Sequence, residues 1–227
     1  MGFSNRINQY FNICLFGKVD EQIDLSDAAD YSQHYVFIHP DNLEGNIYEE
    51  LRQKYDDFSM ACALKPYYSE FFFNDEEVES VLYFDADIYL FSPLTTVLNL
   101  LSDLQNPSSS IILTPHITKV DQFKDEVSKN ISFLTYGTFN AGFFAIKNNQ
   151  EGKKFVQWWK RMLKDFCIIN YNSGLYCDQT WLNLVPILFK DNLCILQDIG
   201  YNVAYWNVDS ERNLSIDSNG QYIINST

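Results

Sequence analysis

Two aspartates, Asp85 and Asp87, follow a run of four apolar residues, 81–84. A run of this kind, rich in aromatic and branched side chains, is typical of a β-strand buried on both faces. Side chains two positions apart on an extended chain point to the same side, so the two carboxylates would converge. Carboxylate oxygens suit Mg²⁺ and Mn²⁺, and Mg²⁺ often takes one or two carboxylates together with substrate phosphates. The pattern predicts a metal and nucleotide site at a strand end, with a solvated turn as the alternative interpretation.

Further polar residues stand at the ends of other predicted strands. The expected strands are residues 10–16, 35–38, 81–84, 111–114, 141–146, 193–196 and 202–206. The expected helices are residues 46–55, 57–73, 94–104, 151–166 and 178–189, with a kink or break at Pro66. Because strands and helices alternate, the sequence predicts an α/β domain with a mainly parallel sheet covered by helices on both faces. Ligands of such sheets bind outside the carboxyl ends of the strands, where Asp85, Asp87, His116 and Asn140 are expected.

Length, charge and cysteine content limit the classes of function. The 227 residues predict one domain, residues 1–209, followed by a polar tail, residues 210–227, without regular structure. The formal net charge of -14 opposes nucleic-acid binding, which requires a basic surface. An anionic nucleotide would therefore need a metal ion to bridge it to this protein. Five scattered cysteines lack the spacing of a zinc site and indicate free thiols in a reducing cytosol. The N-terminus predicts no signal peptide, and no apolar run approaches the roughly 18 residues that span a membrane.

Several blocks of sequence resemble, in order, bacterial nucleotide-sugar glycosyltransferases of the GT-A fold. The relatives belong to the glycogenin and lipopolysaccharide galactosyltransferase group. The resemblance covers roughly residues 10–210 and is far more specific than the Asp-x-Asp pair alone. The blocks are residues 63–68, 81–88, 91–94, 113–116, 139–143, 177–183 and 200–207.

The resemblance implies a GT-A-like, Rossmann-like fold and a nucleoside-diphosphate sugar donor bound with Mn²⁺ or Mg²⁺. It implies that Asp85 and Asp87 are the metal ligands. It also implies that Lys65, Asp85, Asn140 and His116 line the donor site, with Lys65 near the phosphates. The acceptor would be a glycan, a lipid-linked sugar or a protein. The protein is expected to be cytoplasmic, with contact to the inner face of the membrane as a further expectation.

The resemblance places Asp178 and Gln179 beside the anomeric carbon and the acceptor. Glycosyl transfer breaks the bond between the anomeric carbon and a diphosphate, through a transition state with oxocarbenium character. A carboxylate such as Asp178 can stabilise the developing sugar cation or take the proton of the acceptor. A metal held by Asp87 can neutralise the leaving diphosphate, with electrostatic help from Lys65.

Two departures from the family pattern leave other functions open. The strand, turn and helix that usually open the fold are not found, so the sheet is expected to be truncated at its N-terminal edge. The His-containing stretch that usually completes the metal shell is also not found. These gaps favour a second hypothesis, a non-catalytic or split-gene subunit of such an enzyme with a complementing partner chain. A third hypothesis, an Asp-x-Asp phosphatase, is disfavoured because that class places the motif on its first strand.

Each candidate residue also has a structural interpretation. Lys65 could extend along a helix kink, His116 could be satisfied by the backbone, Asn140 could stabilise a turn, and Asp178 could cap a helix. The predicted helix 152–166 carries an aromatic stripe opposite basic residues. This stripe fits either a membrane surface or, as the favoured alternative, a core-packing helix with a solvated basic face.

Overall fold

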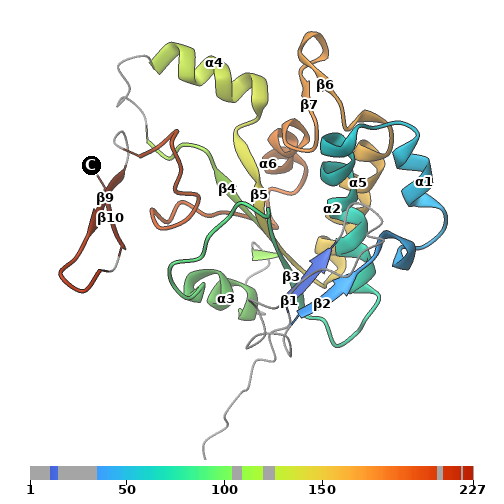
Figure 1. The fold of residues 1–227 in the computed structure, drawn as a ribbon, viewed down its shortest axis with the longest axis horizontal. Helices are drawn as coiled ribbons and strands as arrows, with labels where there is room; N and C mark the ends of the chain where they lie inside the picture. Colours follow the sequence, from blue (N-terminus) through green and yellow to red (C-terminus); the bar gives the residue numbers. More distant parts are fainter. Residues whose placement is uncertain are drawn as a thin grey trace, which may run out of the picture.

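The computed structural model describes residues 11–14, 35–103, 109–119, 126–208, 212–220 and 222–226 (Figure 1). A four-stranded sheet forms its centre, in the strand order β3-β5-β4-β8. These strands are β3 (Ser80–Phe84), β4 (Ile111–Pro115), β5 (Phe139–Lys147) and β8 (Leu193–Ile195). Strands β3 and β4 both pair antiparallel with β5, and within this sheet only β4 and β8 pair in parallel. The protein is therefore α/β, but the expectation of a mainly parallel sheet is wrong for these four strands.

Helices cover both faces of this sheet (Figure 1). The larger core cluster joins alternate residues of β4 and β5, such as Leu113 and Phe144, to Leu64 and Trp159 on the helices α2 (Asp57–Phe73) and α5 (Gln150–Phe166). The intervening strand residues pack on the other face against α3 (Thr95–Ser102). A sheet covered on both faces has apolar side chains at successive positions, which explains the continuous apolar runs in the sequence. The aromatic stripe of α5 is largely used in this core, as the core-packing alternative expected.

Helix α2 runs without a break past Pro66. The missing N–H of a proline removes one helical hydrogen bond, but every residue from Cys62 to Ser69 is buried. Asp56 caps the helix, because its side chain accepts a 2.7 Å hydrogen bond from the Ser59 N–H. Of the expected kink or break at Pro66, the break is wrong, because one helix spans Asp57–Phe73 beneath the sheet.

Strand β3 lies at the edge of the four-stranded sheet and is only half-buried, not buried on both faces as expected. Its aromatic side chains pack along its single partner strand. Tyr83 stacks on Phe144 with ring centroids 4.8 Å apart, and Phe84 lies 5.1 Å from Phe143. Cross-strand aromatic pairs of this kind stabilise an edge strand, so the apolar run at 81–84 marks pairing with β5 rather than complete burial.

Three other expectations are corrected. Residues 202–206 form turns rather than a strand. The expected helix 178–189 is divided into a 3-10 helix, η6 (Thr180–Leu184), and the short α6 (Val185–Leu188), which has a proline in its first turn. The tail contains an antiparallel hairpin of β9 (Arg212–Ile216) and β10 (Tyr222–Ser226). Gly220, with φ of +79°, follows a turn closed by its N–H to the Asp217 carbonyl at 3.1 Å.

The remaining elements are short or peripheral. They are β1 (Phe11–Cys14), β2 (Tyr35–Ile38), η3 (Pro40–Asn42), α1 (Ile47–Arg52), α4 (Glu126–Tyr136), β6 (Ile169–Asn170), η5 (Tyr171–Ser173) and β7 (Leu175–Tyr176). Strands β1 and β2 pair in parallel. Among the described residues, no helix has the length and apolar character needed to cross a membrane.

Candidate functional site

The direction of the strands decides which polar residues meet. Since β3 and β4 both run opposite to β5, their carboxyl ends lie beside its amino end. Phe84 pairs with Phe143 in this register, and Asp85 follows directly, with its N–H donating to the Gly142 carbonyl at 2.8 Å. The residues Asn140, Ala141 and Gly142 thus lie next to Asp85. This meeting of strand ends was expected from the sequence, although a parallel sheet was expected to produce it.

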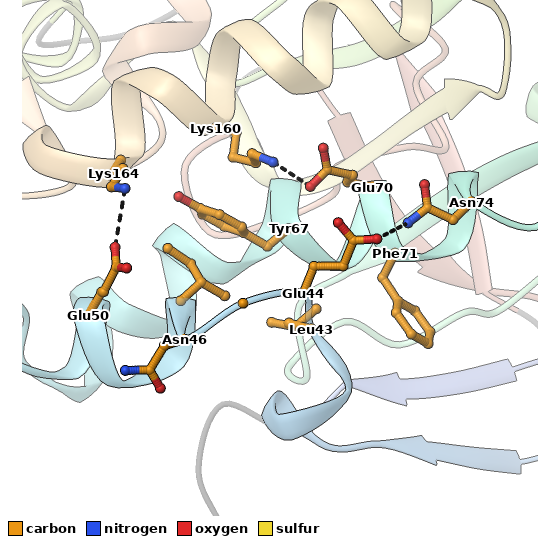
Figure 2. A pocket seen from close by; sticks show the side chains of 12 residues that line it. Leu43, Glu44, Asn46, Glu50, Tyr67, Glu70, Phe71, Asn74, Lys160 and Lys164 are labelled. Carbon is orange, nitrogen blue, oxygen red and sulfur yellow. Dashed lines mark hydrogen bonds and ion pairs between the residues drawn. The ribbon is translucent and has the colours of Figure 1, made fainter.

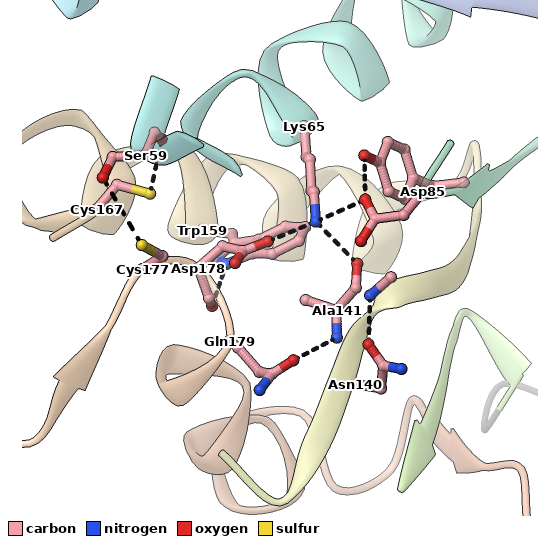
Figure 3. A network of polar contacts seen from close by, with 12 residues as sticks. Ser59, Lys65, Asp85, Asn140, Ala141, Trp159, Cys167, Cys177, Asp178 and Gln179 are labelled. Atoms are coloured by element: carbon pink, nitrogen blue, oxygen red, sulfur yellow. Dashed lines mark hydrogen bonds and ion pairs between the residues drawn. The ribbon is translucent and has the colours of Figure 1, made fainter. Parts of the chain in front are cut away.

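Lys65 connects this strand end to a third segment of the chain (Figure 3). Its Nζ lies 3.2 Å from Asp85 Oδ1 and 2.9 Å from Asp178 Oδ2, and it donates to the Ala141 carbonyl at 3.1 Å. The Lys65 side chain is only 5% exposed. Burial disfavours its positive charge, but neighbouring groups, chiefly Asp178, outweigh this effect and raise the pKa of Lys65 well above its usual value. Lys65 is therefore a buried, charged bridge between two carboxylates.

Asp178 is as deeply buried as its partner, with a side chain 5% exposed. Its backbone carbonyl accepts a hydrogen bond from Trp159 Nε1 at 3.3 Å, so the core helix α5 fixes its main chain. The residue before it, Cys177, has φ of +45°, which is uncommon for a side chain other than glycine. This left-handed residue turns the chain so that the Asp178 carboxylate faces Lys65.

The two carboxylates of the Asp-x-Asp pair have different environments. Tyr83 donates a 2.6 Å hydrogen bond to Asp85 Oδ1, whereas Asp85 Oδ2 faces Gly142, where an added Cβ would lie 2.9 Å away. Asp87 is exposed, beyond the end of β3. Residues 86 and 87 form a turn, with the Ile88 N–H donating to the Asp85 carbonyl at 3.1 Å. The extended-chain argument for converging side chains therefore does not apply past Asp85.

Asn140 and Gln179 hold the start of β5 in place. Asn140 Oδ1 accepts from the Gly142 N–H at 2.8 Å, and its Nδ2 donates to Asn202 Oδ1 at 2.7 Å. Gln179 Oε1 accepts from the Ala141 N–H at 3.2 Å, and its Nε2 donates to the Tyr136 carbonyl at 2.7 Å. Both side chains belong to the network around Lys65, and both use their amide groups within the protein.

His116 lies apart from the Lys65 network, in an aromatic cluster. Its ring stacks on Phe133 and meets Trp206 edge-on, both with centroids 5.2 Å apart. Burial lowers the pKa of His116 to about 4, so the ring is neutral at physiological pH. Its main-chain N–H donates to the Thr138 carbonyl at 3.0 Å. A buried, neutral ring does not suit a charged ligand for phosphate. Among the described residues, Nδ1 of His116 has no hydrogen-bond partner, so the backbone does not satisfy this side chain completely.

Sequence reasoning missed several members of the network. Tyr83 was counted only as an apolar strand residue, although its hydroxyl orients Asp85. Asn202 links Asn140 to β4, because its Nδ2 donates to the Pro115 carbonyl at 2.8 Å. The position of Tyr83 two residues before Asp85 was a usable signal, since both side chains of an i, i+2 pair share one side of a strand. Asn202 belongs to the resembling block 200–207, but no role was assigned to it there; it lies on a bend with φ of +55°.

A separate cavity of about 400 Å³ lies between α1, α2 and α5 (Figure 2). None of the predicted site residues lines it. Its charged groups are paired across the helices, with Lys164 Nζ 3.1 Å from Glu50 and Lys160 bound to Glu70. In the part of the chain that the structure describes, no group of three His, Cys, Asp or Glu side chains is placed to hold a metal ion.

Comparison with known proteins gives one relative of unknown activity. The uncharacterized protein YfnF of Bacillus subtilis strain 168 is 25% identical over 166 residues, which is 73% of this chain and 52% of YfnF. The chain thus spans about half the length of this curated relative. No protein-family model matches the chain, and no solved structure matches it.

Proposed function

We propose that this chain is a metal-dependent glycosyltransferase of the GT-A type. It would transfer a sugar from a nucleoside-diphosphate donor to a glycan, a lipid-linked sugar or a protein. The observation that carries the proposal is the bridge from Lys65 Nζ to Asp85 and Asp178. These residues come from three of the sequence blocks that resemble the family, and the bridge joins a strand-end carboxylate to the predicted catalytic segment.

In this proposal, the carboxylates at the end of β3 would bind a divalent metal ion together with the diphosphate. The Asp85 side chain is 39% exposed, and its Oδ2 faces the space that Gly142 leaves by lacking a Cβ. Asp87 is exposed nearby and offers a second carboxylate. One or two carboxylates completed by phosphate oxygens is a common Mg²⁺ arrangement. When bound, the ion would neutralise negative charge on the leaving diphosphate.

The other residues of the network would have separate roles in binding and catalysis. Lys65 is too deeply buried to serve as a mobile phosphate ligand, so we assign it a positioning role in place of the phosphate contact expected from the resemblance. Its charge offsets the repulsion between Asp85 and Asp178 and fixes both carboxylates. Asp178 is equally buried, with a side chain 5% exposed, so it would stabilise positive charge at the anomeric carbon electrostatically, without contacting the sugar or the acceptor. Asn140 and Gln179 would hold the start of β5 beside it.

The test is nucleotide binding that depends on the metal and on the Asp-x-Asp pair. UDP with Mn²⁺ should raise the melting temperature of the protein, and UDP alone should have a much smaller effect. Asp87→Asn should abolish the metal-dependent part, whereas Asp191→Asn, at another exposed aspartate, should retain it. UDP release from UDP-sugars would then report turnover. If Asp87→Asn and Asp191→Asn respond alike, the proposed metal site is wrong.

A second candidate is a non-catalytic subunit that keeps the fold without turnover. It is favoured by the observation that Lys65, Asn140 and Gln179 direct their polar atoms to partners within the chain. This hypothesis predicts no thermal response to any nucleoside diphosphate, with or without Mn²⁺. It also predicts that Asp178→Asn changes stability alone, because Asp178 would then act only as the partner of Lys65.

A further inference from the structure

Three exposed aromatic rings form a continuous strip beside the Asp-x-Asp pair. Tyr89, Phe91 and Tyr222 are 74%, 62% and 49% exposed. The ring centroids of Tyr89 and Phe91 are 4.6 Å apart, and those of Phe91 and Tyr222 are also 4.6 Å apart. We call these three residues the aromatic strip. It begins two residues after Asp87 and continues onto the C-terminal hairpin.

The hairpin that carries Tyr222 is anchored to the body of the protein. Arg212, at the start of β9, is 1% exposed, and its Nη1 donates to the Tyr201 carbonyl at 2.7 Å. The Tyr201 ring in turn lies 6.0 Å from Phe143 of β5. Tyr222 on the hairpin and Tyr89 and Phe91 after β3 are therefore held together by the fold as well as by the contact between Phe91 and Tyr222.

Apolar side chains extend the aromatic strip. Leu90 lies between its first two residues and is 42% exposed. Ile216, which is 61% exposed, pairs directly with Tyr222 across the hairpin, so the two side chains share one face. Neighbouring exposed aromatic and aliphatic side chains on a folded domain are typical of a binding surface.

The charge around the strip selects the kind of ligand. Residues 85–95 and 213–224 contain Asp85, Asp87 and Asp217 and no lysine or arginine. An anionic membrane surface would be repelled there, and membrane-binding faces are rich in basic residues. A neutral saccharide suits it, because the C–H faces of sugar rings pack on aromatic rings while sugar hydroxyls bond to carboxylates and phenols.

We propose that the aromatic strip binds a neutral oligosaccharide, which serves as the acceptor. The acceptor role rests on the proposed glycosyltransferase function, whereas saccharide binding itself does not. The position of the strip supports this role, since a saccharide stacked on Tyr89 and Phe91 lies next to Asp85 and Asp87. The acceptor class is thereby narrowed from glycans, lipids and proteins to an uncharged glycan chain.

The test is saccharide titration of the full chain without metal or nucleotide. Maltohexaose, cellohexaose and chitohexaose are titrated by calorimetry and by saturation-transfer NMR. At least one should bind, and Phe91→Ala and Tyr222→Ala should each weaken it by about tenfold. Phe91→Trp, which keeps a ring, should retain binding. Phe58→Ala is the matched control, because Phe58 is a 54% exposed phenylalanine at the start of α2.

Four results would overturn the proposal. The first is that none of the three saccharides binds, and the second is that Phe91→Ala and Phe58→Ala bind saccharide equally well. The third is that the protein self-associates and Phe91→Ala abolishes this association. The fourth is that the protein binds phosphatidylserine vesicles through Phe91 and does not bind saccharide. The same variants are assayed for the UDP and Mn²⁺ thermal shift, which Phe91→Ala should leave intact. If the wild-type protein shows the UDP shift but binds no saccharide, the proposal for the aromatic strip is wrong and the glycosyltransferase proposal stands. If the wild-type protein binds saccharide but shows no UDP shift, the glycosyltransferase proposal is wrong and saccharide binding by the strip stands.

Discussion

Lys65 Nζ lies 2.9 Å from Asp178 Oδ2, and both side chains are 95% shielded from solvent, each being 5% exposed. The pair joins the middle of α2 to the segment that precedes η6, 113 positions further along the chain. Removing both charges from water costs free energy, which their attraction and the contacts of Lys65 with Ala141 and Asp85 must offset. The pair is therefore sensitive to the loss of either partner.

Lys65→Met should destabilise the protein by about 3–5 kcal/mol, because it leaves Asp178 buried without a counter-charge. The measurement is the free energy of unfolding in urea. Lys153→Met, at an exposed position on α5, should change it by less than about 0.5 kcal/mol. The double variant Lys65→Met with Asp178→Leu should recover much of the loss. Additive losses in the double variant would show that the two side chains do not interact.

The pH dependence of stability should contain a contribution from His116. Its pKa falls from an unfolded value of 6.5 to about 4 in the folded protein, because burial disfavours the charged ring. The unfolded chain then binds the proton more readily, so stability is complete above pH 6.5 and decreases as the pH falls towards 4. The loss should approach about 3 kcal/mol.

His116→Phe isolates this contribution, since it keeps an aromatic ring between Phe133 and Trp206 and removes the titration. The difference in unfolding free energy between wild type and variant should change with pH only between about 6.5 and 4. A constant difference over this range would mean that the His116 ring is solvated in the folded protein.

Gly142→Ala should disturb the Asp85 carboxylate. The new Cβ would lie 2.9 Å from Asp85 Oδ2 and 3.0 Å from Asn140 Oδ1, which is closer than van der Waals contact allows. We expect a destabilisation of about 1–3 kcal/mol, as in other overpacked sites, and a loss of the Mn²⁺-dependent response to UDP. Gly200→Ala is the control, because its Cβ would come no closer than 3.4 Å to Asp198. Equal effects of the two changes would argue against crowding at Asp85.

Alkylation should distinguish the cysteines. Cys62, Cys167 and Cys177 are buried near Ser59, and Cys167 Sγ donates to the Ser59 carbonyl at 3.2 Å. The pKa of each of these thiols is raised, and Cys177 reaches about 12. Iodoacetamide should therefore modify the partly exposed Cys194 before these three buried cysteines in the native protein, as peptide mass spectrometry can measure. Equal rates at Cys194 and Cys177 would show that the Asp178 segment opens frequently.

Local patterns predicted the elements well and their directions poorly. The apolar runs at residues 35–38, 111–114 and 141–146 are strands, and helix 151–166 is found within one residue of its expected start. The direction of β5 was not predicted, because a strand covered on both faces has the same apolar run whether it is parallel or antiparallel. Direction depends on the path of the preceding chain, which apolar patterning does not encode.

The part of the candidate site that could be predicted consists of residues at the ends of strands. Asp85 and Asn140 were expected near each other and lie on adjacent strands joined by the Gly142 carbonyl. The turn at residues 86–87 corresponds to the alternative interpretation of the Asp-x-Asp pair, which was disfavoured because a buried strand was expected to lead into it. The hairpin in the tail was missed because only half of its strand residues are apolar, although Asp217 and Gly220 bracket a recognisable turn.

The network around Lys65 has a thermodynamic consequence for any ligand that binds there. Asn140, Gln179 and Lys65 already hold one another and the start of β5 through hydrogen bonds within the chain. These groups are preorganised, so little conformational entropy remains to be lost when a ligand arrives. Association should then proceed with almost no movement of this part of the backbone, and hydrogen exchange at Ala141 and Gly142 should be equally slow before and after binding.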